Sequence, residues 1–177
     1  MRFARVDTPI GTLTLVATDD GLREVRFAGQ APPDGAVEAP GDRVLAEAAR
    51  QLAEWFAGER TAFDLPLDLG AATAFQRRAW LALAEVPYAT TRSYGEQADR
   101  LGAPRAARAV GAANGRNPLP VVLPCHRLVG ADGALTGFGG GLDVKRALLD
   151  HEAATAARAA AAGSARTRTS PGPRRRT

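Results

Sequence analysis

The sequence has few of the residues that many catalytic and structural sites require. It contains one cysteine, Cys125, and two histidines, His126 and His151, in 177 residues. A single cysteine excludes an intrachain disulfide, and so few Cys and His residues leave no set for a zinc site. No apolar signal region opens the chain, and no run of about 18 or more apolar residues occurs. We predict a cytoplasmic protein in a reducing compartment, with no metal, no cofactor and no membrane partner.

Positive charge is scarce in the first half of the chain and concentrated in the second. Residues 1–90 carry a net charge of −4 and residues 91–163 a net charge of +3, while residues 164–177 contain five Arg and no acid. Between Arg92 and Arg127 there are six Arg and two acids. A basic stretch of this kind favours nucleic-acid binding. The tail by itself has the composition of solvated, disordered chain.

The first part of the chain has the pattern of a small antiparallel sheet with one helix. Alternating apolar residues predict strands at residues 2–6, 12–17, 22–27 and near 62–67. A hairpin turn is expected at residues 19–21, and residues 30–42 have the composition of a loop. Helical spacing follows from Leu45 until Gly58. We assign residues 1–70 to an N-terminal sheet-bearing domain.

The rest of the chain has the pattern of a mainly helical domain, so the predicted fold class is α+β. Capping boxes at residues 73–76 and 93–96 each begin a helix. A further helix is predicted over residues 105–113, and a last helix from Leu142 through Ala162 that ends at Gly163. We assign residues 71–163 to this domain and residues 164–177 to a disordered basic tail.

Residues 93–113 have the arrangement of a helix-turn-helix. Two short helices are joined by the turn Gly102-Ala103-Pro104. In the second helix every position is Ala or Gly except Arg105, Arg108 and Val110, so few side chains hold its backbone away from a partner. Such a helix can lie against DNA or pack against the core of its own protein. The surrounding positive charge favours DNA.

The lone cysteine stands in a distinctive setting. Residues 119–123 are apolar and predict a short buried strand, which would end at the prolyl turn before Cys125. His126 and Arg127 follow directly, and either can favour the thiolate, the nucleophilic form of the side chain. The alternative is that Cys125 is a small buried apolar residue.

Motifs at ordered separations resolve these alternatives. They are Phe75-Gln76, Pro87-Tyr88, Ser93-Tyr94-Gly95, Arg108-Ala109-Val110-Gly111, Asn114-Gly115, Asn117-Pro118, Pro124-Cys125-His126-Arg127, Gly140-Gly141-Leu142 and Leu148-Leu149-x-x-Glu152. The series closely resembles the O6-alkylguanine-DNA alkyltransferases over about residues 61–152. The resemblance implies single-turnover DNA repair, in which an alkyl group moves from O6-alkylguanine, and possibly O4-alkylthymine, to a protein cysteine.

The resemblance also implies the catalytic residues. Cys125 would be the alkyl acceptor, and His126 its base through a bridging water. Glu152 would orient His126 and stabilise its charge, and Asn117 would brace the turn that carries the cysteine.

The implied partner is double-stranded DNA, bound in the minor groove by a monomer with the alkylated base flipped out. Arg108 resembles the finger that enters the duplex, and Tyr94 the residue that crowds the flipped base and its phosphate. The implied DNA-binding residues are Tyr94, Arg105, Ala106, Ala107, Arg108, Ala109, Gly111, Ala112 and Arg127. The implied substrate pocket consists of Tyr94, Pro120, Val129, Phe138, Gly139 and Gly140.

This sequence departs from the family pattern in the pocket and at the end of the chain. Phe138 stands where the family usually has Tyr, Gly139 where some members have Ser, and the tail after Glu152 is longer. Two other functions compete with alkyl transfer. A cysteine hydrolase would need a histidine from another segment, and only His151 is available. A non-enzymatic helix-turn-helix damage sensor or regulator would explain the charge but not the Cys125 motif.

Overall fold

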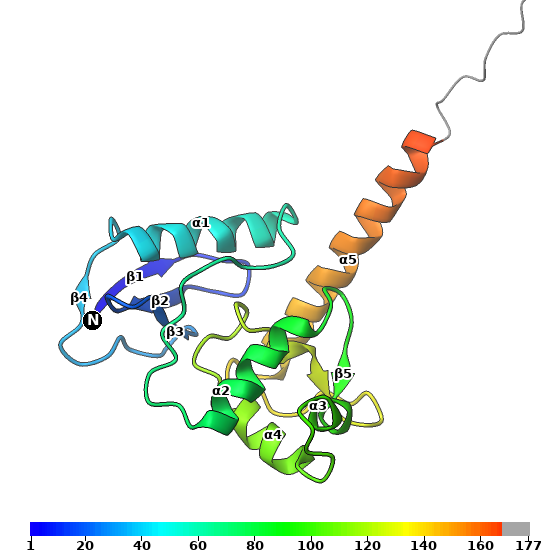
Figure 1. Ribbon diagram of the computed structural model, residues 1–177. Coiled ribbons are helices and arrows are strands. Elements are labelled where there is room, and N and C mark those ends of the chain that lie inside the picture. Colours follow the sequence, from blue (N-terminus) through cyan, green and yellow to red (C-terminus); the bar gives the residue numbers. More distant parts are fainter. Residues whose placement is uncertain (168–177) are drawn as a thin grey trace, which may run out of the picture.

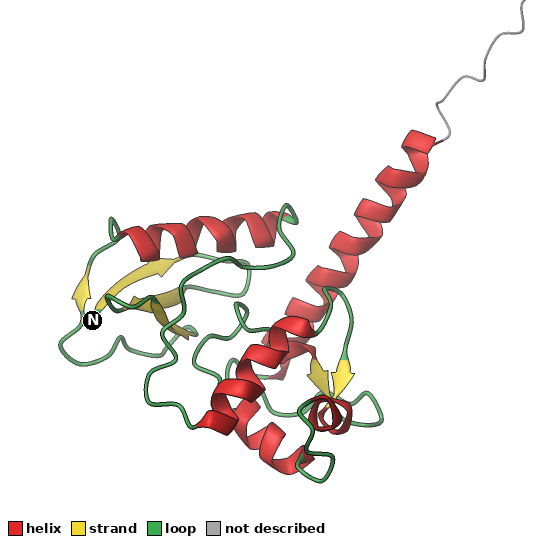
Figure 2. Ribbon diagram, in the orientation of Figure 1, coloured by secondary structure: helices red, strands yellow, loops and turns green. Residues whose placement is uncertain are grey.

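The computed structural model describes the backbone of residues 1–167 and the side chains of residues 1–162. Figure 1 shows two parts, a small sheet with one long helix over it and a helical part from which the last helix projects. The first part contains a four-stranded sheet and the second a two-stranded one. Both are drawn in yellow in Figure 2. The predicted α+β class is therefore confirmed.

The N-terminal sheet has the strand order β3-β2-β1-β4. Its antiparallel core consists of β1 (Arg2–Val6), β2 (Leu13–Ala17) and β3 (Leu22–Arg26), as the alternating pattern predicts. A two-residue strand, β4 (Val37–Glu38), pairs in parallel with β1 inside the stretch predicted to be a loop. The strand predicted near residues 62–67 is reduced to one bridge, between Leu22 and Leu67.

Helix α1 (Arg43–Ala57) begins and ends at residues suited to those positions. The Asp42 side chain accepts hydrogen bonds from the backbone N–H groups of Val44 and Leu45, which have no partner inside the helix. Gly58 ends the helix in the left-handed conformation, at φ 78°. The face toward the sheet buries Leu45, Ala48, Gln51, Leu52 and Trp55.

The helical part contains both predicted capping boxes and the predicted helix-turn-helix. Thr73 and Gln76 exchange hydrogen bonds at the start of α2, and Ser93 and Glu96 do so at the start of α3. The Trp80 indole donates to the Ala113 carbonyl at 2.7 Å and fixes α2 against α4. The helices are α2 (Ala74–Leu81), the 3-10 helix η1 (Ala82–Glu85), α3 (Tyr94–Arg100), α4 (Ala107–Asn114), the 3-10 helix η2 (Cys125–Arg127) and α5 (Leu142–Thr167).

The strand predicted at residues 119–123 is wrong, because this apolar segment forms a buried turn. The Leu123 N–H bonds back to the Leu119 carbonyl at 2.8 Å, and Val121 has a φ of 72°. An extended strand can adopt neither feature. The strand in this region is instead β6 (Leu128–Val129), which pairs in parallel with β5 (Arg92–Ser93).

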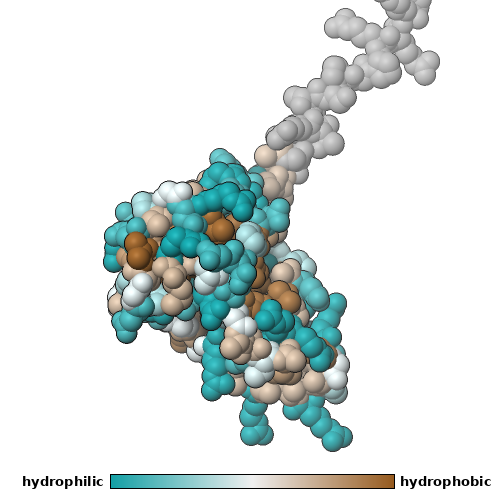
Figure 3. Space-filling model, turned by 60° about the vertical axis from the view of Figure 1, so that its left-hand side comes forward, coloured by the Kyte–Doolittle hydropathy of each residue, from teal (hydrophilic) through white to brown (hydrophobic). Residues whose placement is uncertain are grey.

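Helix α5 continues past the predicted end at Gly163 to Thr167, so the first residues assigned to the tail are helical. The remainder of the predicted tail, residues 168–177, lies outside the described residues. The face of the molecule seen in Figure 3 is largely hydrophilic, with strongly hydrophobic residues in small separate patches. Among the described helices none has the combination of length and apolar character needed to cross a membrane.

One apolar core runs through both parts of the molecule. Trp55 of α1 packs edge-on against Tyr88 at 6.2 Å and accepts a hydrogen bond at its carbonyl from His151 at 3.0 Å. On the opposite side, the Val25 N–H at the end of the sheet donates to the Pro118 carbonyl at 2.8 Å. The sheet is thereby fixed against the segment that precedes Cys125.

Candidate active site

The residue with nucleophilic chemistry, Cys125, opens the 3-10 helix η2 and is buried, with 4% of its surface exposed. Two asparagines hold the chain around it. Asn114 donates from Nδ2 to the Cys125 carbonyl at 3.4 Å, and Asn117 donates from Nδ2 to the Leu123 carbonyl at 2.8 Å. Asn117 therefore lies where it can brace the turn, as the resemblance implies. Asn114, which we did not predict as a site residue, is its counterpart on the other side.

A cavity of about 190 Å³ lies in front of Cys125. It is lined by Val25, Phe27, Gln30, Asn114, Gly115, Arg116, Asn117, Pro120, Cys125, Gly137, Phe138 and Gly139. Three of the six predicted pocket residues, Pro120, Phe138 and Gly139, are in this set. Val129 is instead buried in β6, and Gly140 lies against the Phe27 ring; neither is among the residues that line the cavity.

Behind the cysteine lies a buried group of three charged or polar side chains. His126 contacts Glu152 through Nε2 at 2.9 Å, and both side chains are fully buried. Arg127 donates to the same carboxylate, with Nη2 2.8 Å from Oε1. The guanidinium also donates to the Val86 carbonyl at 2.6 Å and lies over the Tyr88 ring at 5.4 Å.

This geometry corrects the prediction that Arg127 binds DNA. Its side chain is 6% exposed and its donors are directed at Glu152 and Val86 inside the protein. The guanidinium instead neutralises a carboxylate that would otherwise be costly to bury. Two side chains, His126 and Arg127, thus donate hydrogen bonds to Glu152, and only the contact with His126 was implied by the resemblance.

The hydrogen bonds also define the protonation of His126. Burial alone would raise the pKa of Glu152, but hydrogen bonds from His126 and Arg127 outweigh it and hold that pKa below its usual range. The carboxylate is therefore an acceptor, and Nε2 of His126 must carry the proton between them. Nδ1 is left with its lone pair, buried and with no hydrogen-bond partner among residues 1–162. Burial lowers the pKa of His126, against the opposing effect of Glu152. Neutral His126 can therefore accept a proton at Nδ1.

The thiol itself is protonated at neutral pH. Burial raises the pKa of Cys125 to about 11, although a hydrogen bond with Asn117 and the charge of Lys145 act to lower it. Lys145 is fully buried and donates from Nζ to the carbonyls of Leu128 at 2.6 Å and Thr136 at 3.2 Å. The thiolate must therefore be generated during the reaction, with cationic groups nearby to stabilise it.

A second, shallower groove adjoins the cavity and shares Gly115 and Gly137 with it. Tyr94, Ala107, Arg108 and Gly111 of the helix-turn-helix line this groove. The Thr136 hydroxyl donates to the Tyr94 oxygen at 2.9 Å and ties the helix to the loop over the cavity. Helix α4 begins at Ala107, two residues later than predicted. The other predicted DNA-binding residues in and just before it are exposed or half-buried, namely Arg105, Ala106, Ala109 and Ala112.

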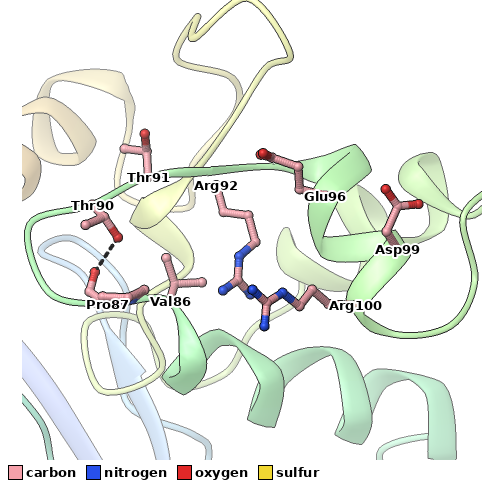
Figure 4. Close-up of a pocket in the computed structure, with 8 residues that line it drawn as sticks. All are labelled: Val86, Pro87, Thr90, Thr91, Arg92, Glu96, Asp99 and Arg100. Carbon is pink, nitrogen blue, oxygen red and sulfur yellow. Dashed lines mark hydrogen bonds between the residues drawn. The ribbon is translucent and has the colours of Figure 1, made fainter.

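Most arginines of the N-terminal part form ion pairs with carboxylates, whereas several arginines in the described residues of the helical part form none. Ion pairs with carboxylates are formed by Arg2, Arg5, Arg23, Arg26, Arg50, Arg60 and Arg127. Within residues 1–162, no carboxylate pairs with Arg92, Arg100, Arg105, Arg108 or Arg116. In the groove beside α3, Arg92 and Arg100 point toward the same space while Glu96 and Asp99 point away (Figure 4). The helical part thus presents unpaired positive charge, which favours a polyanionic partner.

Other site residues escaped prediction for different reasons. Lys145 lies on the buried face of α5 with Leu148 and Glu152, at spacings of three and four, so helical periodicity would have indicated its burial. Val25 and Phe27 reach the cavity from the N-terminal sheet. No local pattern signals that contact. Among the described residues, no group of three or more His, Cys, Asp and Glu side chains gathers to bind a metal.

Comparison with protein families gives two matches that together span most of the chain. Residues 74–154 match the 6-O-methylguanine DNA methyltransferase, DNA binding domain, and residues 1–69 match the 6-O-methylguanine DNA methyltransferase, ribonuclease-like domain.

Individual relatives agree. A methylated-DNA–protein-cysteine methyltransferase of Mycolicibacterium paratuberculosis is 51% identical over 150 residues, which cover 84% of this chain and 90% of the relative. The crystal structure of Mycobacterium tuberculosis OGT in complex with DNA has a TM-score of 0.81 and 48% identity, over 88% of this chain and 94% of that one. An O6-methylguanine-DNA methyltransferase from Pyrococcus kodakaraensis, with 21% identity and a TM-score of 0.64, shares the fold over 85% of this chain and 98% of its own.

Proposed function

The chain belongs to the 6-O-methylguanine DNA methyltransferase family, and we propose that Cys125 is the residue that accepts the alkyl group. The protein is a methylated-DNA–protein-cysteine methyltransferase that repairs alkylated DNA by alkyl transfer. The observation that carries the proposal for Cys125 is its position in the wall of a small cavity, next to the buried, hydrogen-bonded group of His126, Glu152 and Arg127. A helix-turn-helix damage sensor that catalyses no reaction would not need such a group beside a cysteine.

The proposed step is a displacement at carbon. The Cys125 proton passes through a water molecule to Nδ1 of His126, and Glu152 stabilises the resulting imidazolium. The sulfur then bonds to the alkyl carbon as the bond from that carbon to O6 breaks, and the electron pair remains on the guanine. The proton returns to the guanine, so the products are a thioether and an unmodified base. The thioether is stable because its carbon–sulfur bond could break only with the Cys125 thiolate as a poor leaving group.

We propose that the α4 side of the helical part enters the minor groove with the damaged base flipped into the Cys125 cavity. The small side chains on α4 would let its backbone approach the floor of the minor groove closely. The groove beside Tyr94 and Arg108 adjoins the cavity and would lead the flipped base into it. A stacked base cannot reach a buried sulfur, so extrusion is required. Every group in the proposed reaction comes from one chain, which supports action as a monomer. Residues 1–70 and 71–163 remain our proposed domains.

Mass analysis after one reaction tests the assignment of the acceptor. When the protein is incubated with a duplex containing O6-methylguanine, we expect intact mass to increase by one methyl replacing one hydrogen, and peptide mapping to place it on Cys125. The Cys125→Ala variant should bind the same duplex and gain no mass. A methyl group found on another residue, or repair without any gain of mass, would contradict the proposal.

A second prediction concerns Arg108, which is exposed and has no carboxylate partner within residues 1–162. Arg108→Ala should slow repair of the duplex much more than reaction with free O6-methylguanine base. Only in the duplex does the flipped nucleotide leave a gap in the base stack that the Arg108 side chain would fill. The measurement is the single-turnover rate constant on each substrate. Arg105→Ala is the matched control, since it removes an equal charge from the same region. Equal losses on both substrates in Arg108→Ala would exclude the finger role.

A further inference from the structure

We infer that Phe27, from the N-terminal part, sets the size of the alkyl group that the Cys125 cavity accepts. The inference rests on the proposed function and names a specificity-determining residue for the same site. Phe27 follows β3, the edge strand that lies nearest the helical part in Figure 1, and its side chain lines the same cavity as Cys125. Val25 and Gln30 line the cavity beside it, so one wall of the site comes from outside the helical part.

Phe27 is packed against the loop of Phe138 and Gly139, which also line the cavity. Its ring meets the Phe138 ring edge-on, with centroids 5.4 Å apart and an interplanar angle of 62°. A Cβ atom at Gly140 would lie only 2.9 Å from two atoms of the Phe27 ring, and one at Gly139 would lie 3.8 Å away. The loop approaches Phe27 so closely because Gly140 has no side chain. The ring is 8% exposed and has little free space around it.

The backbone on either side of Phe27 is also fixed. Its N–H donates to Oε1 of Gln30 at 2.9 Å, and the Gln30 N–H donates to the Phe27 carbonyl at 3.1 Å. Two residues earlier, Val25 is bonded to the Pro118 carbonyl, in the segment that leads to Cys125. The ring therefore holds a set position relative to the sulfur and is a rigid wall of the cavity.

The volume of the cavity makes the position of this wall decisive. Its volume of about 190 Å³ is below the roughly 300 Å³ of the smallest typical ligand pockets. It is close to the volume of a cavity that binds one benzene molecule, ~150 Å³. In the displacement the sulfur and the leaving oxygen lie on opposite sides of the reacting carbon, so every further carbon of the alkyl group projects sideways into the cavity. A methyl group adds no such atoms. In the proposed reaction the flipped guanine also occupies this cavity, so the ring of a benzyl group has room only if the wall moves. Phe27 is the bulkiest side chain that the N-terminal part places there.

The test compares transfer of two groups from the same duplex position, O6-methylguanine and O6-benzylguanine, by full-length protein. The measured quantity is the ratio of the benzyl to the methyl single-turnover rate constant. Phe27→Ala should raise this ratio by about tenfold or more, since one or two carbons in an apolar pocket already change discrimination by that factor. Phe27→Leu should raise it less, and Phe27→Trp should lower it.

Phe3→Ala is the matched control. Phe3 is also buried in the N-terminal sheet, at 6% exposed, but it does not line the cavity. The Phe3→Ala variant shows how a loss of stability in the N-terminal part affects the benzyl-to-methyl ratio, and we expect no change. The inference is overturned if the ratio is unchanged in folded Phe27→Leu and Phe27→Trp, or if Phe3→Ala changes it equally. Parent protein that transfers neither group would overturn the proposed function and this inference with it, whereas normal methyl transfer with an unmoved ratio overturns the role of Phe27 alone.

Discussion

Glu152→Gln should slow methyl transfer by about 10²- to 10⁴-fold, the usual contribution of a positioned acid or base. The neutral amide cannot stabilise an imidazolium at His126, so the thiol loses its means of deprotonation. The pH dependence should change as well. In the parent, neutral His126 accepts the proton, and the rate should be nearly constant from neutral pH upward and fall only when acid protonates His126. In the variant the thiolate must form by direct ionisation, so the rate should rise with pH toward the Cys125 pKa of about 11.

Loss of stability must be separated from loss of chemistry in this experiment. Glu152→Gln leaves Arg127 buried without its carboxylate, and breaking a buried pair in this way costs about 3–5 kcal/mol of folding free energy. Arg127→Met is the matched control, because it breaks the same pair but leaves Glu152 bonded to His126. Both variants should unfold at lower denaturant concentration, while only Glu152→Gln should acquire the pH-dependent rate. If both variants give the parent's pH profile, Glu152 acts through folding and has no part in proton transfer.

Features set by neighbouring residues were predictable from the sequence. The two capping boxes, the hairpin at residues 19–21 and helix α1 with its Gly58 end each depend on a few adjacent side chains, and the structure has all of them. The segment at residues 119–123 is a buried turn where its sequence predicts a strand, because burial and apolar composition alone do not distinguish the two. Its conformation depends on Asn117, whose amide holds the carbonyl of Leu123 from outside the segment.

The candidate site was predictable only in part for the same reason. Motif positions identified Cys125, His126 and Glu152, and the structure places the latter two in contact. They did not indicate that Arg127 turns inward, since an arginine beside basic sequence has the same appearance whether it faces DNA or a buried carboxylate. The wall formed by Val25 and Phe27 depends on packing between segments far apart in the chain. No local pattern encodes such packing.

The largest consequence of the proposed chemistry is that each molecule should act once. The thioether at Cys125 has no good leaving group, and the sequence has no second thiol to remove the alkyl group. With excess O6-methylguanine duplex, the amount repaired should plateau at one equivalent of protein. The product should also be less stable than the parent, because methylation disturbs the hydrogen bond between the Cys125 side chain and Asn117, and the loss of one hydrogen bond costs about 0.5–1.5 kcal/mol. For a chain of this size that lowers Tm by roughly 2–4 °C per kcal/mol.

Two measurements on the same sample test this. The repaired fraction is followed as the duplex is raised above the protein concentration, and thermal unfolding is compared before and after complete methylation. Cys125→Ala incubated with the same duplex is the control, since it should repair nothing and keep one Tm. Repair that continues beyond one equivalent, with unmodified Cys125 recovered at the end, would require a route for removing the methyl group from sulfur. The group formed by His126, Glu152 and Arg127 does not supply one, because the Glu152 carboxylate is held by hydrogen bonds from the other two side chains, and a methyl group moved to the His126 imidazole would leave the protein modified all the same.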